Sequence, residues 1–163
     1  MNSTRATKAI TIVLTLYIAF VFIQSLFFKF SNSPETQYIF GTLDAWGASL
    51  GFPGVFAPSG VFSQYVVGSA ELAASALLLA GLVFGRPMLQ AGGALLALGV
   101  ISGAIFFHLF TPLGVQVRNT DGSLDGGELF ALACGVWAAA AGLLALRRDD
   151  IRALLQRTRR LAA

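Results

Sequence analysis

The fold of this chain is decided by residues 61–110, which read VFSQYVVGSAELAASALLLAGLVF (61–84), Gly85-Arg86-Pro87 and MLQAGGALLALGVISGAIFFHLF (88–110). Each apolar run is long enough for the roughly 20-residue helix that crosses a bilayer's hydrocarbon core. Glycine and proline between the runs break the helix and let the chain reverse. The stretch therefore predicts two antiparallel transmembrane helices joined by a tight turn.

Two further apolar segments, near 9–30 and near 126–146, show the same signal. The first follows Arg5 and Lys8, as a secretory signal would, but its apolar run is longer than that of a signal. Bulky side chains also stand where a cleavage site would need small ones. We therefore predict an all-α polytopic membrane protein, a single domain over 1–163 with a four-transmembrane-helix bundle.

The composition agrees with a membrane protein and excludes several other classes. The chain is 56% hydrophobic and only 12% charged, with a mean hydropathy of +0.74, whereas soluble domains average roughly 25% charged residues. The single cysteine, Cys134, excludes a disulfide within the chain and a paired-thiol redox motif. No motif for haem, flavin or an iron–sulfur cluster is present.

The net charge of +3 does not indicate nucleic acid as a partner, because six of the eleven basic residues lie in the last seventeen. A basic tail, 147–163, directly after an apolar helix is typical of a cytoplasmic anchor near anionic lipid. With the N-terminus inside, nine basic residues lie inside and only Lys29 and Arg118 lie outside. The positive-inside rule therefore places both termini in the cytoplasm, and we expect a bacterial cytoplasmic membrane.

The first outer loop is predicted to contain a short interfacial helix near 34–46. Ser33-Pro34-Glu35 provides an N-cap, a proline at the first helical position and an acid in the first turn. Beyond it, a glycine- and proline-rich stretch, 47–60, contains Phe52 and Phe56, which are too apolar to point at water. We expect this loop to lie in the membrane interface or to fold back as a lid.

Glu71 is the sharpest candidate for a site. It lies on a polar or small stripe of the second apolar segment, together with Gln64, Gly68 and Ser75. We place it about ten residues into that helix, at a depth of roughly 15 Å. A carboxylate there must be protonated, paired or ligand-bound. It is either a ligand anchor, proton-transfer group or metal ligand, or a structural hydrogen-bonding group, for example to Lys29.

The other ionisable candidates also have more than one interpretation each. Lys29 either extends to the interface or is a counter-ion for Glu71 or an anionic ligand. His108 is an interfacial hydrogen-bonding residue, a proton carrier, or a metal ligand with Asp125 or Glu128. The two acids also suit the start of the last helix as caps. All these residues lie toward the outer half, while the inner half is almost purely apolar, which predicts one site on the outer side.

Small residues in the third and fourth apolar segments allow close helix contacts, either within the bundle or between protomers. The third contains Gly99 and Gly103 four residues apart, and the fourth has small residues at 131, 135, 138 and 142. Such spacing is typical of helix–helix contact in membranes.

Several stretches together resemble the DoxX-like family of small four-helix membrane proteins. They are Phe27-Phe28-Lys29-Phe30 with Pro34-Glu35, Tyr38-Ile39-Phe40 with Thr42-Leu43, Gly68-Ser69-Ala70-Glu71-Leu72, Ser102-Gly103-Ala104-Ile105-Phe106 with His108-Leu109, and Asp125-Gly126-Gly127 with Leu129-Phe130. The resemblance covers about residues 10–146. It implies that Lys29, Glu35, Glu71, His108 and Asp125 form the family's polar set. Segment 47–60 and the arginine tail depart from the family's pattern.

The resemblance also implies a role in a membrane complex, because the family's name comes from a membrane subunit of a thiosulfate:quinone oxidoreductase. Our first hypothesis is an accessory subunit of a membrane oxidoreductase that binds a quinone-type ligand near Glu71 and His108, with Lys29, Asp125, Glu35 and Gln64 around it. The alternatives are a non-enzymatic scaffold or assembly factor, and a small, dimeric proton-coupled carrier. The expected partners are the lipid bilayer and another membrane protein or a second copy.

Overall fold

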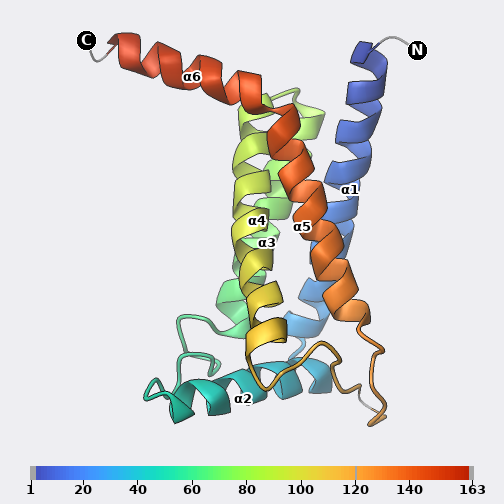
Figure 1. The fold of residues 1–163 in the computed structure, drawn as a ribbon, viewed down its shortest axis with the longest axis vertical. Helices are drawn as coiled ribbons and strands as arrows, with labels where there is room; N and C mark the ends of the chain where they lie inside the picture. The colour runs from blue at the N-terminus through green and yellow to red at the C-terminus, as the bar shows by residue number, and fades with distance from the viewer. Residues whose placement is uncertain (1–2, 120, 162–163) are drawn as a thin grey trace.

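The computed structural model describes residues 3–119 and 121–161, which fold into α-helices (Figure 1). These are α1 (Ser3–Phe30), α2 (Pro34–Ser49), α3 (Gln64–Val83), α4 (Pro87–Phe110), α5 (Glu128–Leu146) and α6 (Arg148–Leu161). Helices α1, α3, α4 and α5 are long and apolar enough to cross a membrane. The predicted four-helix bundle with a short helix in the first long loop is confirmed, and the chain is an integral membrane protein.

The four long helices form a ring in which α1 and α4 each pack against both α3 and α5. Their shared core is rich in alanine, which lets the helix backbones approach closely. The buried core residues are Ile18, Phe22, Ala74, Leu78, Ala94, Ala97, Ile101, Ala133, Val136, Ala139, Ala140 and Leu143. Large apolar side chains such as Phe20 and Leu95 are more than 60% exposed on the outside. Lipid would cover that surface.

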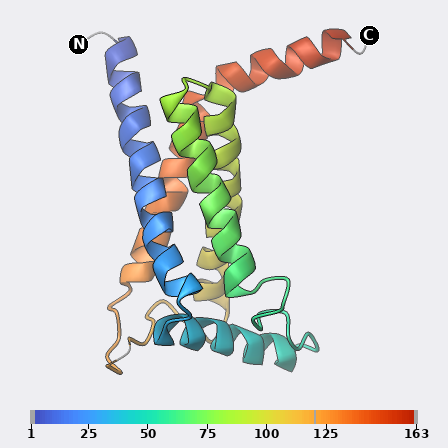
Figure 2. The same cartoon turned by 180° about the vertical axis from the view of Figure 1, so that it is seen from behind.

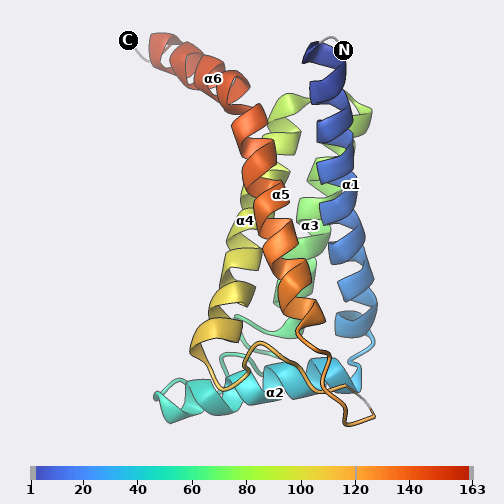
Figure 3. The same ribbon diagram turned by 45° about the vertical axis from the view of Figure 1, so that its right-hand side comes forward.

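The two ends of the bundle differ (Figures 2 and 3). Helix α2 crosses one end beneath the long helices, and we call this the loop end. Both termini of the chain and α6 lie at the other end, which we call the terminal end. The start of α1 and the whole of α6 therefore lie at the same end of the bundle, and the cytoplasmic location of both termini stays a prediction.

Helix α2 begins as the sequence predicts and ends one turn later. The Ser33 hydroxyl accepts a hydrogen bond from the Thr36 N–H at 3.3 Å, and Pro34 opens the helix. The helix runs through Gly47 to Ser49 because Gly47 is buried against the Phe56 ring. The stop is instead Gly51, whose φ of +90° suits only glycine well, with the Phe52 N–H donating to Gly47 O at 2.9 Å.

Helices α3 and α5 both begin later than predicted. The later start of α3 changes the depth of Glu71. Ser63 caps α3, its hydroxyl accepting from the Val66 N–H at 3.3 Å, so residues 61–63 belong to the loop. Glu71 is therefore the eighth residue of α3, about 10 Å along the helix from its first residue, rather than 15 Å. The start of α5 moves from 126 to Glu128 because Gly126 and Gly127 have positive φ angles.

The basic tail forms a helix, which the charge pattern alone did not predict. Arg147 ends α5, and α6 then runs sideways off the bundle at the terminal end (Figure 1). Ile151, Leu154, Leu155 and Leu161 recur at helical spacing among the arginines, and this amphipathic pattern was the available signal. Such a pattern suits a helix in a membrane interface, as predicted for an anchor near anionic lipid.

Candidate functional site

Glu71 and Lys29 form a buried ion pair between α3 and α1. Lys29 Nζ lies 3.0 Å from Glu71 Oε2, and the two side chains are 17% and 7% exposed. Ser25, one turn before Lys29 on α1, donates its hydroxyl to the same oxygen at 2.7 Å. The predicted polar stripe of α3 is indeed buried. The carboxylate is thus held by a cation and a hydroxyl of this chain.

The polar cluster continues toward the loop end through Gln64. Its amide nitrogen donates to Lys29 O and to Asn32 Oδ1, both at 2.9 Å, which ties the start of α3 to the end of α1. The Lys29 stem passes beside Gly68 on its way to Glu71, and a Cβ at Gly68 would lie at an ordinary contact distance of 3.5 Å from the lysine Cδ.

His108 belongs to a second polar group, at the end of α4. The side chain is 8% exposed, and Nδ1 lies 2.7 Å from Gly114 O, which fixes the ring against the loop after α4. Phe130 of α5 packs edge-on against it, with the ring centres 5.7 Å apart. The imidazole therefore joins the α4–α5 loop to the bundle.

Asp125 organises that loop and caps α5. Its Oδ1 accepts hydrogen bonds from the N–H groups of Val117 and Gly127 at 2.8 and 2.9 Å, and Oδ2 accepts from Leu129 at 3.2 Å. Gly127 has no side chain to cap α5, so the carboxylate two residues earlier satisfies the free N–H of Leu129 in the first turn. These contacts are those of a helix cap, which is one of the interpretations that the sequence gives for Asp125.

The pKa of Asp125 lies below its ordinary value of 3.8. Burial raises it, but the hydrogen bonds from Gly127, Val117 and Leu129, with the nearby His108, outweigh that effect. A carboxyl whose folded pKa is lowered stabilises the folded state above its unfolded pKa, and this contribution is lost as the pH falls through the folded pKa.

We therefore expect Asp125→Ala to lower the free energy of unfolding by about 1–2 kcal/mol at pH 7, because it leaves the capped N–H groups without their acceptor. Stability of the wild type should be insensitive to this group above about pH 5 and should fall below about pH 4. Thermal unfolding of the detergent-solubilised protein measures both. Asp125→Asn should flatten the acid limb, and an unchanged limb would assign it to other carboxylates.

The remaining candidates are more peripheral. Glu35 stands half-buried in the first turn of α2, and Glu128 is exposed in the first turn of α5. Within residues 3–119 and 121–161, no three side chains of histidine, cysteine, aspartate or glutamate gather as a metal site. The predicted metal pair of His108 and Glu128 thus lacks a third protein ligand in this part of the chain.

No family model matches this chain, and no curated protein or solved structure matches it significantly. The resemblance to the DoxX-like family therefore stays a prediction. The structure brings the predicted residues together in two groups, Glu71, Lys29 and Gln64 on one side and His108 with Asp125 on the other.

A third polar cluster lies at the terminal end, which corrects the expectation that this half is almost purely apolar. Thr11, Thr15 and Gln90 are each no more than 3% exposed. The Gln90 amide donates to Thr15 Oγ1 at 3.4 Å, and its oxygen accepts from Arg147 Nε at 3.0 Å. The available signals were the two threonines four residues apart and the lone glutamine in an apolar helix. These residues were missed because no ionisable side chain of the membrane-spanning segments lies beside them in the sequence.

Proposed function

We propose that this protein is an accessory or assembly subunit that binds a transmembrane helix of another membrane protein through one face of α4. The observation that carries the proposal is an open glycine face on α4. Gly92 and Gly99 are exposed, and a Cβ at Gly92, Gly99 or Gly103 would meet no atom within 4 Å. Leu95 and Phe106 are exposed beside these glycines.

The small residues of α5 are used differently, which makes the α4 face distinctive. A Cβ at Gly135 would overlap the Tyr17 hydroxyl of α1, and one at Gly142 would lie 3.3 Å from Leu14. These glycines therefore serve contacts within the bundle. Gly99 and Gly103 have the spacing of a helix-docking motif, and in membranes such motifs let a neighbouring helix approach closely.

The state of the polar residues also supports a binding role over a catalytic one. Glu71 is held by Lys29 and Ser25, and His108 by Gly114. Asp125 is occupied by backbone N–H groups. These contacts hold helices and loops in place, as expected for a scaffold protein.

Adding bulk to the α4 face should separate the partner without unfolding the protein. We expect Gly99→Leu with Gly103→Leu to reduce recovery of the native complex at least tenfold, because the side chains hold the partner helix away. Ala73→Leu with Ala76→Leu, which adds two leucine side chains at exposed positions of α3, is the matched control. Native gel electrophoresis and mass spectrometry after gentle solubilisation give the recovery, and equal recovery of all variants would contradict the proposal.

If the resemblance to the DoxX-like family holds, the partner complex is an oxidoreductase. One observation favours a second candidate function, the binding of a quinone-type ligand. A buried ion pair contributes little net stability, so a ligand-binding role for Lys29 and Glu71 is a reasonable alternative. The lysine ammonium can donate to a quinone carbonyl. Mass spectrometry of the purified native protein tests this: a quinone present in the wild type and lost in Glu71→Gln supports the second candidate, and equal quinone content contradicts it.

A further inference from the structure

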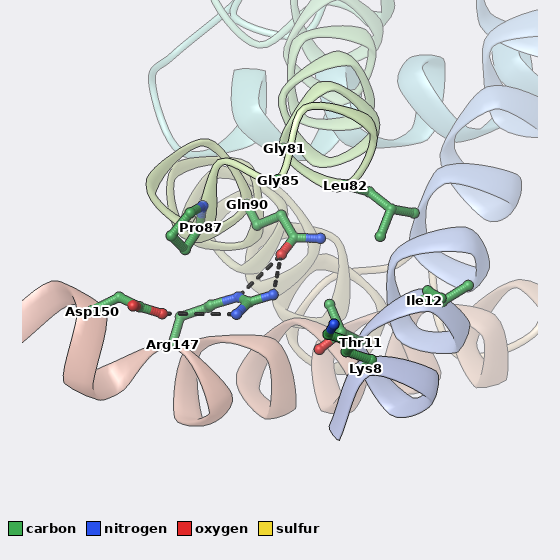
Figure 4. A pocket seen from close by; sticks show the side chains of 10 residues that line it. All are labelled: Lys8, Thr11, Ile12, Gly81, Leu82, Gly85, Pro87, Gln90, Arg147 and Asp150. Atoms are coloured by element: carbon green, nitrogen blue, oxygen red, sulfur yellow. Dashed lines mark hydrogen bonds and ion pairs between the residues drawn. The ribbon is translucent and has the colours of Figure 1, made fainter. Parts of the chain in front are cut away.

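A cavity of about 470 Å³ opens at the terminal end, among α1, the α3–α4 turn, the end of α5 and the start of α6 (Figure 4). Its lining combines two cations, Lys8 and Arg147, with one carboxylate, Asp150. Arg147 Nη1 lies 3.7 Å from Asp150 Oδ2. The charged groups of the lining therefore leave one excess positive charge.

The same lining contains a buried hydroxyl. Thr11 lines the cavity and is 3% exposed, yet its Oγ1 has no hydrogen-bond partner in the described part of the chain. A buried polar group left unpaired costs about 1–3 kcal/mol, so proteins rarely retain one without a purpose. Lys8 stands one turn before Thr11 on α1, on the opposite side of the cavity from Gln90 and Arg147 (Figure 4).

The cavity is braced by contacts that hold Arg147 in place. The guanidinium donates from Nε and Nη2 to Gln90 Oε1, at 3.0 and 2.5 Å. Gln90 in turn fits against Gly81, where a Cβ would come within 2.6 Å of it. The arginine is 22% exposed, so one of the two cations is positioned by the bundle itself.

We propose that this cavity binds the phosphate group of an acidic phospholipid. A phosphate diester offers several oxygen acceptors to the Lys8 ammonium, the Arg147 guanidinium and the Thr11 hydroxyl together. The site lies where the membrane-crossing helices end, which is the level of lipid headgroups, and basic pockets between helices suit such headgroups. Ile12 and Leu82 add an apolar part to the lining, which an acyl chain can contact and free phosphate cannot.

The test measures binding of phosphatidylglycerol, diacylglycerol and inorganic phosphate to the full-length protein in detergent by native mass spectrometry. We expect one phosphatidylglycerol per chain and no retention of diacylglycerol. Thr11→Val should weaken binding about fivefold through one lost hydrogen bond, and Lys8→Gln about tenfold. Arg5→Gln, the same charge change at an exposed position of α1 outside the lining, should have no effect.

The same variants distinguish an effect on folding from an effect on binding. They also distinguish a lipid from free phosphate as the source of the bound phosphate. Thr11→Val should leave the thermal midpoint of the ligand-free protein unchanged or higher, because it removes a hydroxyl without a partner. If inorganic phosphate alone binds with the same dependence on Thr11 and Lys8, the phosphate site stands and its source is free phosphate rather than lipid. Binding that Arg5→Gln weakens as much as Lys8→Gln, with Thr11→Val inert, would overturn the site.

Discussion

Lys29→Met is expected to lower the free energy of unfolding by about 3–5 kcal/mol, because it leaves the Glu71 carboxylate buried without its cation. Methionine keeps an unbranched apolar chain in the space beside Gly68, so packing changes little. Ser25 still donates to Glu71, but one hydroxyl does not replace a charge. The measurement is denaturant unfolding of the protein in mixed micelles, followed by circular dichroism.

The double variant Lys29→Met with Glu71→Met distinguishes a broken pair from general loss of packing. Replacing both members of a buried ion pair by apolar residues is often neutral or stabilising, and the Ser25 hydroxyl can then donate to Phe22 O, which lies 2.7 Å away. We therefore expect the double variant to recover most of the lost stability. A double variant as unstable as Lys29→Met would show that the pair's environment, rather than the unpaired charge, controls the effect.

The sequence was sufficient for the architecture because the bilayer imposes strong rules. Long apolar runs predict spanning helices, and the Gly85-Arg86-Pro87 turn predicts the α3–α4 hairpin. Caps made by local side chains, such as Ser33 on α2, were also predictable. The start of α3 was missed because the apolar run continues through Val61 and Phe62 into the loop, where the Phe62 N–H bonds Val55 O at 2.9 Å.

The site was only partly predictable, because pairing depends on the relative placement of helices. Periodicity placed Glu71 on an inward face and suggested Lys29 as its partner, but only the structure shows that the two side chains meet, at 3.0 Å. The α4 and α5 small-residue faces look alike in sequence, yet one is packed and the other open. Hydropathy also concealed the Thr11 and Gln90 cluster, since one or two polar residues barely change the mean over a long apolar segment.

Gly93 and its neighbour Gly92 are expected to respond to alanine with opposite signs. A Cβ at Gly93 would lie 2.9 Å from Leu78 N and 3.0 Å from Ala74 O. Because these are backbone atoms of α3, the two helices must move apart, and we expect Gly93→Ala to lower the free energy of unfolding by about 1–3 kcal/mol. A Cβ at Gly92 meets nothing within 4 Å, so Gly92→Ala should gain up to about 1 kcal/mol from helix propensity.

The paired comparison isolates the close contact between α3 and α4, because the two glycines are adjacent on one helix and undergo the same chemical change. Gly93→Leu should cost more than Gly93→Ala, since a larger side chain forces a larger separation. Unfolding in mixed micelles gives the three values side by side. Equal effects at Gly92 and Gly93 would mean that backbone flexibility, rather than the approach of α3 to α4, determines the response. A loss of stability at Gly93 alone would show that the ring of four helices depends on the close contact between α3 and α4.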